Sequence, residues 1–182
     1  MAYRRGFKSE ANWYAREMRR ELGLGPHSPL CPWKLAAHLE FPLFTLSSLA
    51  QAAPEVVTYF RSSVGQSEFS AITLFDGPHR WIIHNDAHDR KRQAADIAHE
   101  LAHGLLLHPP KPPLDANGSR HYDADREEEA NWLGPALLIS DEAAVQIARR
   151  GHTVAQASDI YGASLDVVRF RLNVSGAYKR AA

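Results

Sequence analysis

The sequence predicts an α+β fold that is mostly helical and contains a small antiparallel sheet of about three strands. β-forming residues gather between residues 56 and 85, and apolar residues at helical spacing precede and follow that stretch. With 182 residues and 45% hydrophobic composition, the chain can bury one sizeable core. We therefore expect one compact unit, with a main domain over residues 1–140 and a helical segment over residues 141–182 packed on it.

Two helices are predicted ahead of the sheet. Residues 9–22 place apolar side chains among charged ones at roughly helical spacing, and Gly23 ends the pattern. A second, shorter helix is expected over residues 32–40, because Pro32 stands where helices often begin. Both segments therefore belong to the helical part of the fold.

Three strands are predicted from the segments VVTYFR (56–61), FSAITLF (69–75) and WIIHN (81–85). Each is rich in β-branched and aromatic residues. The last two segments are separated by residues 76–79, Asp-Gly-Pro-His, which are typical of a turn. We expect these two strands to form a hairpin.

Two longer helices are predicted after the sheet. Apolar residues at helical spacing run from about residue 89 to residue 108, and the Pro- and Gly-rich residues 109–122 predict a loop. The next helix is expected to begin near Asp125, which would be its N-cap with Glu128 three residues later. Pro135 lacks an N–H, so a kink or an early break is expected there.

The last third of the chain predicts three short helices with turns at Gly151 and Gly162. Residues 154–173 resemble a helix-turn-helix, a unit that ordinarily reads DNA. However, Asp166 lies in the presumed recognition helix and basic residues there are few. Packing, or docking of a repressor, explains this segment at least as well as DNA binding does.

Composition excludes several classes of protein. Lys plus Arg and Asp plus Glu balance at 21 each, so the bulk positive charge that drives non-specific nucleic-acid binding is missing. No apolar run reaches the length needed to cross a membrane, and the first residues lack the apolar core of a signal peptide. The single cysteine, Cys31, permits no intrachain disulfide. We expect a cytoplasmic protein without a membrane partner.

The segment IAHELAH, residues 97–103, carries the strongest chemical signal. Positions i and i+4 of a helix lie on one face, so His99 and His103 can reach the same cation. Glu100 would then lie beside the pair, where it could take a proton from a water at the metal. The alternative is a half-buried helix whose histidines bind no metal.

A third ligand is needed for a catalytic zinc site, and the segment DREEEAN (125–131) offers three glutamates. Glu127 and Asn131 are four residues apart, so Glu127 could bind the metal while Asn131 steadies a zinc histidine through a hydrogen bond. Glu129 is the next candidate. The alternative is an acidic first turn that complements the helix dipole and binds nothing.

The other histidines give weaker signals of function. His108 follows His103 by five residues, so it is expected to point elsewhere and to cap the end of the helix. His121, Tyr122 and His152 could each stabilise an oxyanion, but their spacing gives them no defined geometry.

The run NDAHDRKRQAADIAHELAHGLLLH, followed by EEEANWLGPALLIS, resembles the ImmA/IrrE family of zinc metallo-endopeptidases. The resemblance extends over about residues 30–175. It implies that His99, His103 and Glu127 are zinc ligands in a minimal zincin-like domain, that Glu100 is the catalytic base, and that the substrate is a helix-turn-helix repressor cut during stress or induction of a mobile element. Leu133-Gly134 stand where Phe-Ala is usual, a departure that concerns packing behind the site.

Two functions therefore follow as hypotheses. The first is a zinc-dependent endopeptidase acting on a repressor, with Mn²⁺ as another ion that two histidines and a carboxylate accept. The second is a regulatory module that grips a repressor or DNA without cutting it, with a structural metal or none. In that module Arg169 and Arg171 would be essential and Glu100 would have no role.

Overall fold

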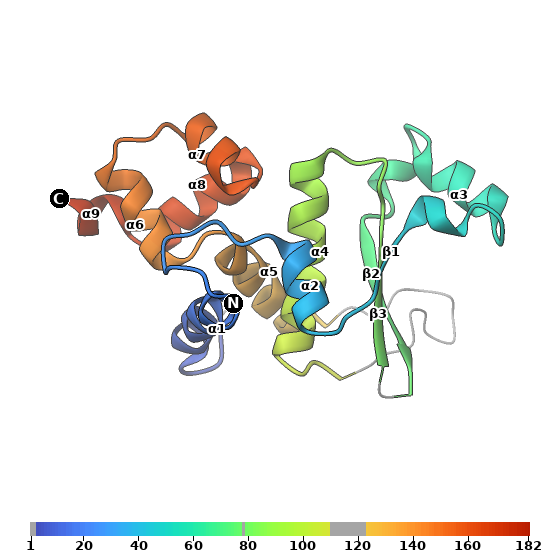
Figure 1. Ribbon diagram of the computed structural model, residues 1–182, viewed down its shortest axis with the longest axis horizontal. Coiled ribbons are helices and arrows are strands. Elements are labelled where there is room, and N and C mark those ends of the chain that lie inside the picture. The colour runs from blue at the N-terminus through green and yellow to red at the C-terminus, as the bar shows by residue number, and fades with distance from the viewer. Residues whose placement is uncertain (1–2, 78, 110–122) are drawn as a thin grey trace.

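The computed structural model describes residues 3–77, 79–109 and 123–182, and confirms an α+β fold in which helices surround a small sheet (Figure 1). The α-helices of these residues are α1 (Phe7–Glu21), α2 (Pro32–His38), α3 (Pro54–Arg61), α4 (Arg90–Leu105), α5 (Ala124–Leu138), α6 (Asp141–Arg149), α7 (Val154–Tyr161), α8 (Leu165–Val174) and α9 (Ala177–Ala181). The strands are β1 (Leu43–Thr45), β2 (Ala71–Asp76) and β3 (His79–His84), and two 3₁₀ turns are η1 (Leu46–Leu49) and η2 (Gly65–Ser67).

The sheet is mixed, with strand order β1-β3-β2. β2 and β3 form the expected antiparallel hairpin, in which Thr73 pairs with Ile82. β1 lies parallel to β3, with Leu43 opposite Ile82, so the prediction of a purely antiparallel sheet is wrong. β3 is therefore the central strand and β2 forms one edge.

The segment VVTYFR is helical rather than a strand, because it makes up most of α3. Pro54 stands at the first helical position and Glu55 lies in the first turn, and both favour a helix start. One side of the helix buries Val57 against Leu46 and Phe69. This packing overrides the preference of β-branched residues for strands.

α4 and α5 pack against each other at the centre of the molecule, and the sheet lies on the other side of α4 (Figure 1). Ile97 and Leu101 of α4 are fully buried with Leu133 of α5 and Ile82 of β3. α4 begins at the N-cap Asp89, whose carboxylate accepts hydrogen bonds from the next backbone N–H groups. α4 buries these residues against both α5 and the sheet, and this packing fixes how the helix is rotated about its own axis.

α5 differs from expectation at two points. Its N-cap is Asp123, whose carboxylate accepts a hydrogen bond from the N–H of Arg126, whereas Asp125 is exposed within the first turn. The helix continues through Pro135 to Leu138. The residues around the proline are buried in the core, and this burial outweighs the local cost of the missing N–H.

The C-terminal residues form four helices rather than the three expected, and the additional helix is the short α9. Both expected turns are present, with φ of 64° at Gly151 and 59° at Gly162, values that favour glycine. These helices share a second apolar cluster with the end of α5. The predicted boundary near residue 140 stays a prediction.

Within the described residues, no helix combines the length and apolar character that a membrane span requires.

Candidate metal centre

His99 and His103 lie one turn apart on α4, and their Nε2 atoms are 3.0 Å apart. The two side chains point the same way because helical geometry places positions i and i+4 on one face. Their side chains are 25% and 17% exposed, so the pair is accessible from solvent although neighbouring residues of α4 such as Ala98 and Ala102 are buried. Two imidazole nitrogens thus point into the same small volume.

Glu127 approaches this pair from the first turns of α5. Its Oε2 lies 3.3 Å from Nε2 of His99, and its Oε1 lies 3.5 Å from Nε2 of His103. One ligand atom from each of the three residues falls within 4.8 Å of the other two. α5 can come this close because it carries Gly134 where it passes α4, and a Cβ there would lie 3.1 Å from the backbone of His99.

The spacing of these atoms fits a tetrahedral metal ion. Ligand atoms about 2.0–2.1 Å from such an ion lie about 3.3 Å from one another. The three separations in the structure are 3.0, 3.3 and 3.5 Å. Two imidazoles and one carboxylate also form a donor set that zinc accepts, with a fourth position left for another ligand. The residues present therefore fit a catalytic zinc ion.

Electrostatics also favours a cation at this point. Hydrogen bonds with His103 and His99 hold the pKa of Glu127 well below its usual range, although burial opposes this shift. Burial lowers the pKa of His99, but its hydrogen bond to Glu127 and the charge of Glu100 outweigh burial, so the pKa of His99 is raised. Glu127 is thus ionised at neutral pH, and negative charge surrounds the imidazoles.

Glu100 points toward the sheet from the same part of α4. Its Oε2 accepts a hydrogen bond of 2.5 Å from Oγ1 of Thr73, a residue of β2. This contact holds the carboxylate against the edge strand, and its charge acts on the neighbouring His99. Thr73 did not emerge from the sequence, because only the packing of β2 against α4 brings it here.

The other candidates on α5 lie apart from the three ligand atoms. The carboxylate of Glu129 contacts Arg4 and His108 instead, at 2.7 and 3.2 Å. Asn131 is exposed, and no hydrogen bond among the described residues joins it to a histidine of the pair. The steadying role expected of Asn131 therefore has no contact to support it.

His108 lies against His103, contrary to expectation. Their Nδ1 atoms are 2.8 Å apart. The spacing argument fails because α4 ends at Leu105 and Leu107 takes a left-handed conformation with φ of 54°, which turns the chain back. The N–H of His108 then donates to the carbonyl oxygen of His103 at 3.0 Å, and Arg80 of β3 donates to the same carbonyl at 3.4 Å.

The structure gives no support for an oxyanion site among the residues considered for that role. His121 and Tyr122 fall outside the described residues. His152 follows α6, where its N–H donates to the carbonyl of Ile147 among the C-terminal helices.

Comparison with known proteins identifies one relationship. The family model described as IrrE N-terminal-like domain, Peptidase_M78, matches residues 53–173, about two thirds of the chain. Neither a curated protein nor a solved structure gives a significant match. The matched range includes α4, α5 and the helix-turn-helix-like segment.

Proposed function

The chain belongs to the IrrE N-terminal-like peptidase family, and on this premise we propose that it is a zinc-dependent endopeptidase whose substrate is a helix-turn-helix repressor. The observation that carries the proposal is the cluster of His99, His103 and Glu127 with tetrahedral spacing beside Glu100. Zinc is the ion we propose, and Mn²⁺ is a second ion that the same donors accept. Bound zinc would supply Lewis-acid polarisation of water and of a peptide carbonyl.

In this proposal the chain's own residues move the protons. Glu100 takes a proton from the attacking water and later gives it to the leaving amine, which is general base and general acid catalysis by one carboxylate. Thr73 donates to one oxygen of Glu100, which leaves the other oxygen for the water. His99, His103 and Glu127 act as ligands and take no part in proton transfer.

A substrate strand would add to the sheet at β2. The central strand β3, which contains most of WIIHN, already has a neighbouring strand on each side. β2 has no strand on its outer side within the described part of the chain, and its Thr73 contacts Glu100. An extended peptide paired with β2 would therefore lie next to the proposed base.

The arrangement of the C-terminal helices gives little support to DNA binding. Arg171 is fully buried and forms an ion pair with Asp141 at 2.6 Å. Arg169 forms an ion pair with Asp166 on the surface of α8 at 2.9 Å. Arg171 therefore cannot reach a phosphate, and Arg169 alone offers little positive charge, so the non-proteolytic module is the weaker hypothesis.

The test compares host cells that produce the wild type with cells that produce Glu100→Gln. Mass spectrometry of newly formed protein N-termini should find a cut helix-turn-helix repressor in the first culture alone. Elemental analysis should find one zinc per chain in both proteins. Glu128→Gln, a neighbouring surface change on α5, is the control and should cleave as the wild type does.

Either of two results would contradict the proposal. One is a wild-type protein that neither contains zinc nor takes it up. The other is a Glu100→Gln protein that produces the same new N-termini at the wild-type rate.

A further inference from the structure

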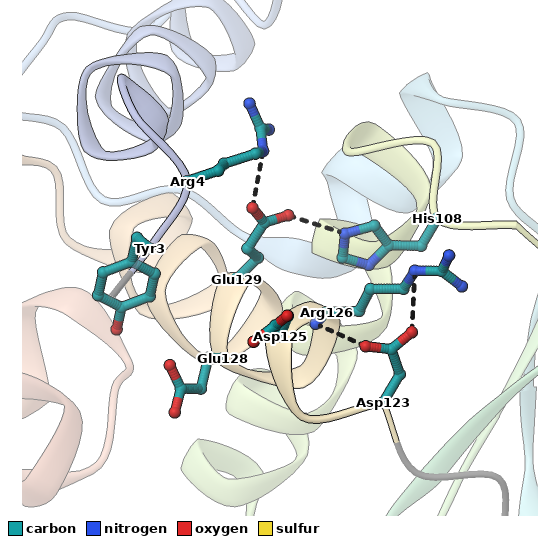
Figure 2. A pocket seen from close by; sticks show the side chains of 8 residues that line it. All are labelled: Tyr3, Arg4, His108, Asp123, Asp125, Arg126, Glu128 and Glu129. Carbon is teal, nitrogen blue, oxygen red and sulfur yellow. Dashed lines mark hydrogen bonds and ion pairs between the residues drawn. The ribbon is translucent and has the colours of Figure 1, made fainter. Parts of the chain in front are cut away.

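A chain of hydrogen bonds extends from His103 away from the metal centre and reaches the N-terminal arm. Nδ1 of His103 lies 2.8 Å from Nδ1 of His108, and Nε2 of His108 lies 3.2 Å from Oε2 of Glu129. The other carboxylate oxygen of Glu129 accepts a hydrogen bond from Nε of Arg4 at 2.7 Å. Figure 2 shows the Glu129 carboxylate between Arg4 and His108. We call these three residues the Arg4–Glu129–His108 chain.

Only one assignment of protons satisfies every bond of this chain if His103 binds a metal through Nε2. That nitrogen must then carry no proton, so Nδ1 of His103 carries it and donates to Nδ1 of His108. His108 in turn carries its proton on Nε2 and donates to Glu129, which as a carboxylate can only accept. Arg4 donates to Glu129 and completes the series.

The surroundings restrict these groups to this arrangement. The side chains of His108 and Glu129 are 9% and 13% exposed, so water competes little for their hydrogen bonds. Arg4 also forms an ion pair with Glu10 of α1 at 2.6 Å, which holds the guanidinium at the open end of the chain. Arg4, His108 and Glu129 also line a pocket of about 450 Å³ along this side of α5 (Figure 2).

We propose that His108 and Glu129 are positioning residues that fix the tautomer and orientation of His103 for metal binding, with Arg4 restraining Glu129. This inference rests on the proposed metal site and adds residues to it. A carboxylate acting on a ligating imidazole through a hydrogen bond makes the imidazole a better ligand, and loss of such a partner costs about 10- to 100-fold in metal affinity. Here the carboxylate acts through a second imidazole.

The test measures zinc affinity by competition with a chromophoric chelator, using zinc alone as the probe. Glu129→Leu and His108→Leu should each bind zinc about 10- to 100-fold more weakly than the wild type. Glu129→Gln should lose less affinity than Glu129→Leu, because its amide oxygen still accepts from His108 although the charge and the bond from Arg4 are lost. Glu128→Gln should be unchanged, since in Figure 2 that carboxylate points away from His108.

A double variant separates this role from a general effect on folding. If Glu129 acts only through His108, Glu129→Leu should cause no further loss of affinity in a His108→Leu protein. Nitrogen-15 NMR of the zinc-loaded wild type should also find the His103 proton on Nδ1. Urea unfolding of each metal-free variant measures whether the substitution also lowers the stability of the fold.

The outcomes distinguish this inference from the proposed function. A wild type that binds no zinc would overturn both. If the wild type binds zinc and the two leucine variants bind it equally tightly, the positioning role alone is overturned. Losses of affinity that add in the double variant would overturn it as well.

Discussion

The two ends of α5 meet charged groups in opposite ways. At the first end, Glu127 joins two histidines whose side chains are 25% and 17% exposed, and their nitrogen and oxygen atoms face a common point. At the last end, the backbone carbonyls of Leu138 and Ile139 accept hydrogen bonds from the buried guanidinium groups of Arg19 and Arg171, at 3.0 and 2.8 Å. One end is open to a ligand and the other is closed by the protein itself.

Burial explains the difference. Both arginines have no exposed surface, and burial lowers the pKa of Arg19 to about 10, which still leaves it charged at neutral pH. The helix dipole places partial negative charge at this end, so buried cations are favourable there. The first end is only partly buried, and one nitrogen or oxygen atom from each of its three residues lies within 4.8 Å of the other two. The same helix therefore accepts hydrogen bonds from buried cations at one end and contributes to a candidate metal site at the other.

The largest effect is expected from Glu127→Ala at the open end. Removal of a direct ligand should weaken zinc binding by more than about 100-fold, beyond the loss expected for an indirect partner. The metal-free protein should unfold at a somewhat lower urea concentration than the wild type, because the ionised Glu127 also forms hydrogen bonds with both histidines. Chelator competition and urea titration measure the two quantities, and Glu128→Ala is the matched control. Unchanged zinc affinity would remove Glu127 from the site.

At the closed end, Arg171→Met should cost about 3 kcal/mol of unfolding free energy. The change leaves the carbonyl of Ile139 without this donor and removes the buried partner of Asp141. Zinc affinity should stay within about threefold of the wild type, because the change is at the other end of α5. The control is Arg169→Met on the same helix, whose exposed ion pair contributes no more than about 1 kcal/mol. Equal losses in the two variants would contradict the comparison.

Ser140→Ala should weaken the closed end more modestly. Oγ of Ser140 accepts a hydrogen bond from the N–H of Ala143 at the start of α6 and donates to the carbonyl of Pro26 at 2.7 Å. Loss of such an N-cap costs about 1 kcal/mol. Thermal and urea unfolding should detect the loss, with no change in zinc content. A stability equal to that of the wild type would mean that this turn is held by packing alone.

The smallest effect is expected from Thr73→Val at the open end. The change removes the hydrogen bond to Glu100 and keeps the shape of the side chain. A typical hydrogen bond contributes about 0.5–1.5 kcal/mol, which corresponds to a rate loss of about 2- to 10-fold. The cleavage rate of the identified repressor measures this loss, while zinc affinity should not change. A variant that cleaves as fast as the wild type would show that Glu100 needs no support from β2.

Much of the fold could be predicted from local signals. The hairpin of β2 and β3, α4 and the turns at Gly151 and Gly162 depend on neighbouring residues, and they appear as expected. The errors concern VVTYFR, the partner of β3, the N-cap of α5, the break expected at Pro135 and the unpredicted helix α9. β1 has only three residues, too few for a sequence signal, and its pairing with β3 joins segments far apart in the chain.

The sequence by itself determined the proximity of His99, Glu100 and His103, because the period of the α-helix fixes which side chains share a face. The tertiary structure decided the rest of the candidate site. Glu127, not Glu129, faces the histidines because the crossing of α4 and α5 at Gly134 sets the rotation of α5. The left-handed turn at Leu107 likewise returns His108 to His103. Helical spacing is a local property, whereas these contacts depend on how separate segments pack.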